Sequence, residues 1–67
     1  MKIRINGEER EIPDGLNVMA MLAHLGMAND RVAIECNLDI LPRNLWANTA
    51  VQPADSFEIV HFVGGGQ

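Results

Sequence analysis

The residues that are best suited to take part in a chemical reaction lie together at the end of the sequence, Val63-Gly64-Gly65-Gly66-Gln67. Glycines lose more conformational entropy on ordering than any other residues, so a glycine run is poor material for a core. Four extended residues span roughly 13 Å, enough to carry a terminal carboxylate through a channel too narrow for side chains. The run indicates either an arm that reacts in another protein's active site or an inert end.

The other reactive side chains form no pattern typical of catalysis or metal binding. Cys36 is the only cysteine, which excludes an internal disulfide and the four-ligand spacings of zinc sites. We interpret it as a packed side chain, with a sulfur relay as the alternative. His24 and His61 have no Cys, Asp or Glu arrangement beside them that suits a metal ion. The sequence therefore predicts no catalytic residue and no metal ligand.

Composition favours one small globular domain that works with a protein partner. The chain has 67 residues, of which 48% are hydrophobic, so there is enough apolar material to form one core without disulfides or a structural metal. Its net charge of −4 gives no reason to bind nucleic acid or an anionic membrane, and favours a basic protein. The single cysteine and the alternating start, without a continuous apolar segment, predict a cytoplasmic location.

Hydrophobic periodicity predicts the first elements. Apolar and polar residues alternate over residues 1–5, as in a strand with one buried face. Asn6-Gly7 is the preferred centre of a two-residue hairpin turn, so residues 8–12 should return antiparallel. Asn17 is a predicted helix N-cap, and Gly26 a predicted left-handed stop. The helical face between them holds apolar residues spaced three and four apart: Val18, Met21, Leu22 and Leu25.

The second half of the sequence predicts short strands around a turn. The expected elements are a strand over 32–36, a turn over 37–39, an extended piece at 40–41, a brief edge strand over 49–51 and a final strand over 57–62. We therefore predict an α+β fold, the ubiquitin-like β-grasp. In it one mixed sheet packs on a single main helix, and the last strand is central beside the first. The domain should cover residues 1–63, with a flexible tail over 64–67.

One helix can cover only one face of such a sheet. Val60 and Phe62 should therefore point away from the core side that carries Phe57 and Ile59. Together with Val63 they form a candidate partner-binding patch beside the tail. Trp46, with Arg43 nearby, either faces a partner or closes the core, and the core interpretation is favoured.

Three segments together resemble a known family, the ThiS sulfur carriers of thiamin thiazole biosynthesis. They are the ending Ile59-Val60-His61-Phe62-Val63-Gly64-Gly65-Gly66, the segment Leu41-Pro42-Arg43-Asn44-Leu45-Trp46, and the opening hairpin. A diglycine end alone is shared by ubiquitin and several other carriers. The combination of the Pro-Arg-x-x-Trp segment with the Phe-Val-Gly-Gly-Gly end is more specific, and the similarity spans essentially the whole chain.

The resemblance implies a carrier cycle in which the protein is a co-substrate and not an enzyme. A ThiF-like partner would use ATP and magnesium to adenylate the carboxylate of Gly66, with Gly64 and Gly65 as the rest of the reactive tail. Sulfur from a donor such as a cysteine desulfurase would then give a thiocarboxylate, which thiazole synthase would consume. No cofactor is expected to be bound by the chain itself.

Gln67 departs from the family pattern, which typically ends at the last glycine. We expect it to block chemistry at Gly66 until it is removed. Two alternatives remain open at this point. One is a carrier of the same chemistry for another pathway, of the molybdopterin, amino acid or siderophore type, with trimming after the glycines. The other is a noncovalent β-grasp interaction module with an inert tail.

Overall fold

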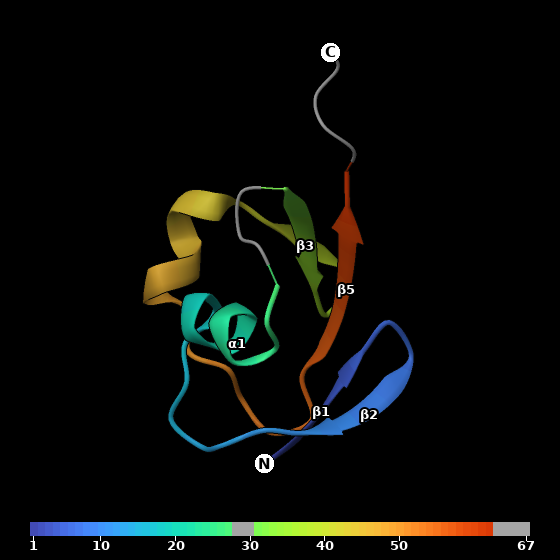
Figure 1. Ribbon diagram of the computed structural model, residues 1–67, viewed down its shortest axis with the longest axis vertical. Helices are drawn as coiled ribbons and strands as arrows, with labels where there is room; N and C mark the ends of the chain where they lie inside the picture. The colour runs from blue at the N-terminus through green and yellow to red at the C-terminus, as the bar shows by residue number, and fades with distance from the viewer. Residues whose placement is uncertain (28–30, 63–67) are drawn as a thin grey trace.

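The computed structural model describes residues 1–27 and 31–62 (Figure 1). Its elements follow in the order β1 (Lys2–Ile5), β2 (Glu8–Glu11), α1 (Val18–His24), β3 (Val32–Cys36), β4 (Asp39–Leu41), the 3-10 helix η1 (Arg43–Asn48) and β5 (Ser56–His61). The strands form one sheet in the order β2-β1-β5-β3-β4. β5 runs parallel to β1 and antiparallel to β3, so the last strand is central and beside the first, as predicted.

Both helices lie on one side of the sheet (Figure 1). In β1, β3 and β5 the buried residues alternate with exposed ones, so one face of each of these three strands enters the core. The core consists of Ile3, Ile5, Ile12, Val18, Met21, Leu22, Val32, Ile34, Trp46, Val51, Phe57 and Ile59. The predicted arrangement of a mixed sheet on one main helix is confirmed.

The first hairpin is closed by Asn6 and Gly7, with φ angles of 51° and 83°. Ile5 pairs with Glu8 across them, so the turn has two residues, both with positive φ, as the Asn-Gly pair predicts. The Asn6 side chain also joins this turn to the central strand. Its Nδ2 donates to the carbonyl of Ile59 at 3.2 Å, and its Oδ1 accepts from the N–H of Ile59 at 2.8 Å.

The second hairpin also turns over two residues, Asn37 and Leu38, with φ angles of 53° and 76°. Cys36 pairs with Asp39 across them. The predicted three-residue turn over 37–39 was therefore one residue too long, because Asp39 already belongs to β4. A leucine in this conformation is uncommon, since its side chain crowds the backbone when φ is positive.

Helix α1 begins and ends where the sequence predicts. The Asn17 side chain accepts a hydrogen bond from the N–H of Ala20 at 2.7 Å, which satisfies one free donor of the first turn. Gly26, just beyond the helix, has a φ of 73°, the left-handed geometry that glycine adopts without steric cost. Val18, Met21 and Leu22 are fully buried.

The predicted edge strand over residues 49–51 is not formed. The structure has only an isolated bridge between Asn17 and Ala50 there. The same segment is nevertheless tied to the start of α1, because the N–H of Val18 donates to the carbonyl of Thr49 and the N–H of Val51 donates to the carbonyl of Leu16. These two hydrogen bonds satisfy backbone N–H and C=O groups as strand pairing would, but no further pairs extend them into a strand.

Candidate functional site

Strand β5 carries a buried side and an exposed apolar side. Phe57 and Ile59 are buried, whereas Val60 is 60% exposed and Phe62 is 49% exposed. The sequence prediction that Val60 and Phe62 face away from the core is confirmed. Since the helices cover only the other face, these two apolar side chains are exposed to solvent, and Phe62 comes two residues before the first glycine of the run in the sequence.

The exposed apolar surface continues across the sheet to its far edge. Ala33 is exposed and pairs with Val60, while Ile40 in the edge strand β4 is 78% exposed and Leu38 in the adjoining turn is 88% exposed. We call Ala33, Leu38, Ile40, Val60 and Phe62 the apolar face. A hollow of about 190 Å³ lies within it, with Ala33, Ile40 and Val60 among its lining residues. This hollow is smaller than a typical small-molecule site, so the surface suits a protein better than a ligand.

Two carboxylates accompany the apolar face. Glu35 pairs with Glu58 across β3 and β5, and both side chains are exposed and line the same hollow. Like charges directly opposite each other in a sheet repel, and a nearby cation relieves that repulsion. The face is therefore complementary to a partner surface that is apolar and carries basic side chains.

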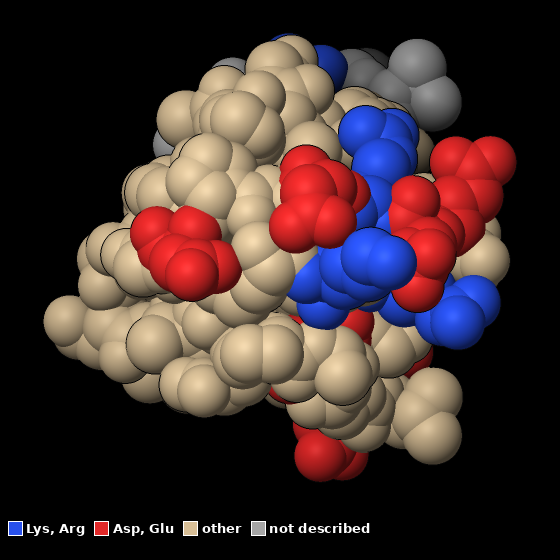
Figure 2. Space-filling view, turned by 90° about the horizontal axis from the view of Figure 1, so that it is seen from below, with Lys and Arg blue, Asp and Glu red and all other residues tan. Residues whose placement is uncertain are grey.

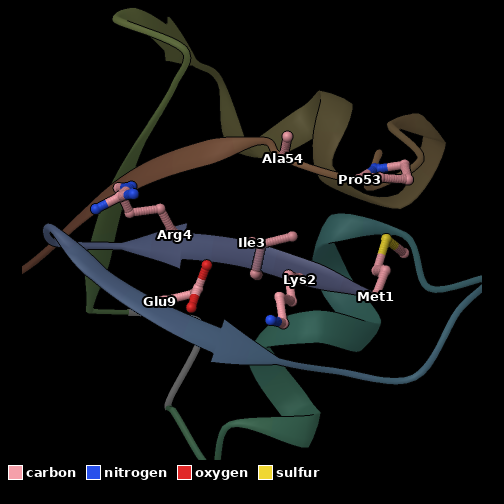
Figure 3. A pocket seen from close by; sticks show the side chains of 7 residues that line it. All are labelled: Met1, Lys2, Ile3, Arg4, Glu9, Pro53 and Ala54. Carbon is pink, nitrogen blue, oxygen red and sulfur yellow. The ribbon is translucent and has the colours of Figure 1, made fainter.

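The half of the sheet made by β1 and β2 has a different character. Lys2 pairs with Glu11 and Arg4 pairs with Glu9, so charges of opposite sign lie across from each other. Figure 2 shows basic and acidic side chains gathered side by side on one part of the surface. Lys2, Arg4 and Glu9 also line a hollow of about 380 Å³ next to Pro53 and Ala54 (Figure 3). Its lining holds no Cys, Ser or His side chain.

Cys36 is half-buried at the end of β3 and packs against the core. Burial raises the pKa of its thiol, and the nearby carboxylates of Asp55 and Asp39 raise this pKa further. A raised pKa lowers the thiolate fraction at neutral pH, and the thiolate is the form that attacks or carries sulfur. The environment of Cys36 therefore favours a packing role over a sulfur relay.

In the carrier cycle that the resemblance implies, we expect Cys36→Ala to leave sulfur loading within about twofold of the parent chain, because a small strand residue replaces a half-buried thiol at modest cost. Loading is followed by intact mass after reaction with the adenylating partner. Cys36→Ser is the matched control, since it keeps the size and removes the thiol. Complete loss of loading in both folded variants would establish the sulfur relay.

Trp46 lies in the core and not on a partner-facing surface. It is 1% exposed, and its indole Nε1 donates to the carbonyl of Leu41 at 2.9 Å. The Arg43 guanidinium lies over its ring, 5.0 Å from the centroid, in cation–π geometry. The core interpretation of Trp46 is thus confirmed, and η1 is the element that positions it.

The reactive tail predicted from the sequence lies outside the described residues. This applies to Val63, Gly64, Gly65, Gly66 and Gln67. Within residues 1–27 and 31–62, His, Cys, Asp and Glu side chains form no group of three suited to a metal ion. In the same part of the chain, no helix has the length and apolar character needed to cross a membrane.

Sequence reasoning found Val60 and Phe62 but missed Leu38 and Ile40. The sequence signal that could have revealed these two residues was the dipeptide at the second turn. Asn37 is followed by Leu38, whereas the first hairpin has glycine after its asparagine. Recognition of a second two-residue turn would have placed a leucine at a strained, exposed position and Ile40 on an edge strand.

The sheet order β2-β1-β5-β3-β4, with one main helix on one face, defines a ubiquitin-like β-grasp domain. The sequence profile of the ThiS family matches residues 3–66. The chain belongs to the ThiS family. Its fold is similar to the crystal structure of the thiamine biosynthesis protein ThiS from Geobacter metallireducens, with a TM-score of 0.83 and 32% identity over 98% of this chain and all of that one.

Two longer proteins contain a region similar to almost the whole chain. A thiazole synthase from Paramagnetospirillum magneticum is 47% identical over 98% of this chain. A thiazole synthase from Magnetococcus marinus is 39% identical over 100% of it. The chain spans only 20% and 21% of the lengths of these relatives.

Proposed function

We propose that this protein is a sulfur carrier that delivers sulfur as a terminal thiocarboxylate to a thiazole synthase in thiamin biosynthesis. The observation that carries the proposal is the family match over residues 3–66, which extends through the glycine run. The close structural similarity to a thiamine biosynthesis protein supports the same pathway. A carrier supplies the transferred atom, and its partners supply the catalytic groups.

The proposed chemistry occurs at the carboxylate of Gly66. A ThiF-like enzyme with ATP and magnesium transfers AMP to this carboxylate and releases pyrophosphate, which converts a poor electrophile into an acyl-adenylate. A persulfide sulfur then attacks the acyl carbon and displaces AMP. A thiol cleaves the sulfur–sulfur bond of the resulting acyl persulfide, which leaves the thiocarboxylate and a disulfide. A cysteine desulfurase is a suitable source of the persulfide.

Thiazole synthase is the proposed acceptor of the sulfur. Two relatives that bear this name include a region similar to this chain within a longer polypeptide. Such a polypeptide keeps carrier and synthase at high effective concentration, which favours a direct encounter between them. The apolar face, whose Phe62 comes two residues before Gly64 in the sequence, is the candidate surface for that encounter.

Intact mass tests the proposal directly. A chain that ends at Gly66 and one that ends at Gln67 are each incubated with the adenylating enzyme, ATP, magnesium and a sulfur donor. We expect the Gly66 form to gain about 16 Da, the difference between sulfur and oxygen at an activated carboxyl. We expect the Gln67 form to load poorly, because its carboxylate lies about 3.3 Å further along and a bulky side chain precedes it.

Each other outcome has a defined meaning. If the Gln67 form loads as fast without losing its last residue, Gly66 is not the reacting terminus. If neither form loads although both are folded, the carrier function is refuted and a noncovalent interaction module replaces it. Addition of thiazole synthase, together with the co-substrates that accept the sulfur, should return the mass of the loaded Gly66 form to its starting value, because oxygen replaces the transferred sulfur at the terminal carboxyl.

A further inference from the structure

The two hairpin turns differ in a way that protein stability does not explain. Both have positive φ at both central residues, but the first is Asn6-Gly7 and the second is Asn37-Leu38. Glycine adopts this geometry without steric cost, whereas leucine crowds its own backbone. Buried contacts could offset that strain, but Leu38 is 88% exposed. Leu38 is thus unfavourable for the isolated domain in two ways: its backbone is strained, and its apolar side chain is exposed to water.

The turn is held rigidly in this conformation. The Asn37 backbone N–H donates to the carbonyl of Ser56 at 2.7 Å, and its side-chain Oδ1 accepts from the N–H of Ser56 at 3.0 Å. Its Nδ2 donates to Asp55 Oδ1 at 3.1 Å. These bonds tie the turn to the start of β5, so Leu38 is presented from a fixed backbone. A backbone that is already held in place loses little entropy when a partner covers the side chain that it carries, which favours binding.

The position of Leu38 enlarges the candidate contact surface. Asn37 is bonded to Ser56 at the start of β5, whereas Phe62 follows its end. The apolar face therefore runs the length of the central strand, roughly 20 Å at about 3.3 Å per residue. A stable protein interface covers about 800 Å² on each partner, so a contact surface that extends from Phe62 to Leu38 suits such an interface better than a patch near Phe62 alone. Ile40, two residues after Leu38 in the sequence, lines the hollow together with Val60.

We propose that Leu38 is a contact residue for thiazole synthase and marks the far end of the surface on which the synthase docks. The inference rests on the proposed function, because the partner is taken from it. The synthase surface should be apolar, with basic side chains that face Glu35 and Glu58, whose paired carboxylates border the same hollow. Strain that persists at an exposed position is typical of functional contacts.

The test measures the affinity of the carrier for its cognate thiazole synthase by calorimetric titration, together with the melting temperature of the free carrier. Leu38→Asn and Leu38→Gly remove the apolar side chain and suit positive φ. We expect both variants to melt at or above the temperature of the parent chain and to bind the synthase at least about fivefold more weakly. Ala54→Gly is the matched control. Ala54 also has a positive φ, 70°, but lines the separate hollow beside β1, so its replacement should not alter binding.

Several results would overturn the inference. Synthase binding by the Leu38 variants within about twofold of the parent would do so, even if self-association or binding to the adenylating enzyme changed. A clear drop in melting temperature would show that Leu38 serves the fold. If the parent chain loads sulfur but does not bind the synthase, this inference and the proposed acceptor both fail. If the parent binds and only the Leu38 variants are unaffected, the proposed function stands and this inference alone fails.

Discussion

Phe62→Asp is expected to weaken binding to the two proposed partners, the adenylating enzyme and thiazole synthase, by about 30-fold or more, while the free domain stays folded. Phe62 is half exposed, so its replacement removes few contacts from the core. At a protein contact, however, the new carboxylate loses its water without gaining a partner, and truncation of a central aromatic typically costs about 2 kcal/mol or more. Titration of each partner gives the affinity, and circular dichroism gives the melting temperature.

His61→Asp is the matched control for Phe62. It places the same charge one residue earlier, on the strand face that carries Phe57 and Ile59, and His61 is itself exposed. We expect this variant to keep its affinity within about threefold. Equal losses for the two variants would indicate a general effect of negative charge near the tail. A large fall in the melting temperature of free Phe62→Asp would place Phe62 in the core.

Trp46→Ala is expected to lower the free energy of unfolding by at least about 3 kcal/mol, which is a large part of the total. Removal of a fully buried tryptophan costs about 3–5 kcal/mol, and the carbonyl of Leu41 also loses its hydrogen bond from Nε1. For a chain of 67 residues the total free energy of unfolding is only about 3–10 kcal/mol. Urea denaturation followed by fluorescence or circular dichroism gives the difference.

Two further variants separate the causes of that loss. Trp46→Phe keeps an aromatic ring but cannot donate to Leu41, and we expect it to cost about 1–3 kcal/mol. Leu45→Ala lies in the same 3-10 helix at a position that is 44% exposed, and we expect a cost below about 1 kcal/mol. A stable Trp46→Ala domain would mean that η1 and its tryptophan are dispensable for the fold.

The elements governed by local chemistry could be predicted from the sequence. Asn6-Gly7 specifies its turn because both residues tolerate positive φ. Asn17 begins the helix because its side chain caps the first turn, and Gly26 ends it because glycine adopts positive φ without steric cost. The alternation of Val60 with Ile59 likewise predicted which side of β5 is exposed. Each of these inferences needs only a residue and its immediate neighbours.

The features that depend on distant partners were harder to predict. The turn at Asn37-Leu38 is held by hydrogen bonds to Asp55 and Ser56, almost twenty residues later, so a leucine with positive φ has no local signature. The sequence predicted a brief edge strand over residues 49–51, yet the hydrogen bonds of this segment go to the start of α1. The predicted reactive tail, with Gly66, lies outside the described residues, so its role stays a prediction.

The place of β5 in the sheet has a consequence for synthesis. β5 pairs with β1 on one side and β3 on the other, and it is the strand that joins the two hairpins into one sheet. Arg4 pairs with Ser56, more than fifty residues further along the chain. A growing chain must therefore carry two unconnected hairpins until β5 emerges from the ribosome. Assembly of the sheet is then a late, all-or-none event, slowed by the long loop that the β1–β5 pairing has to close.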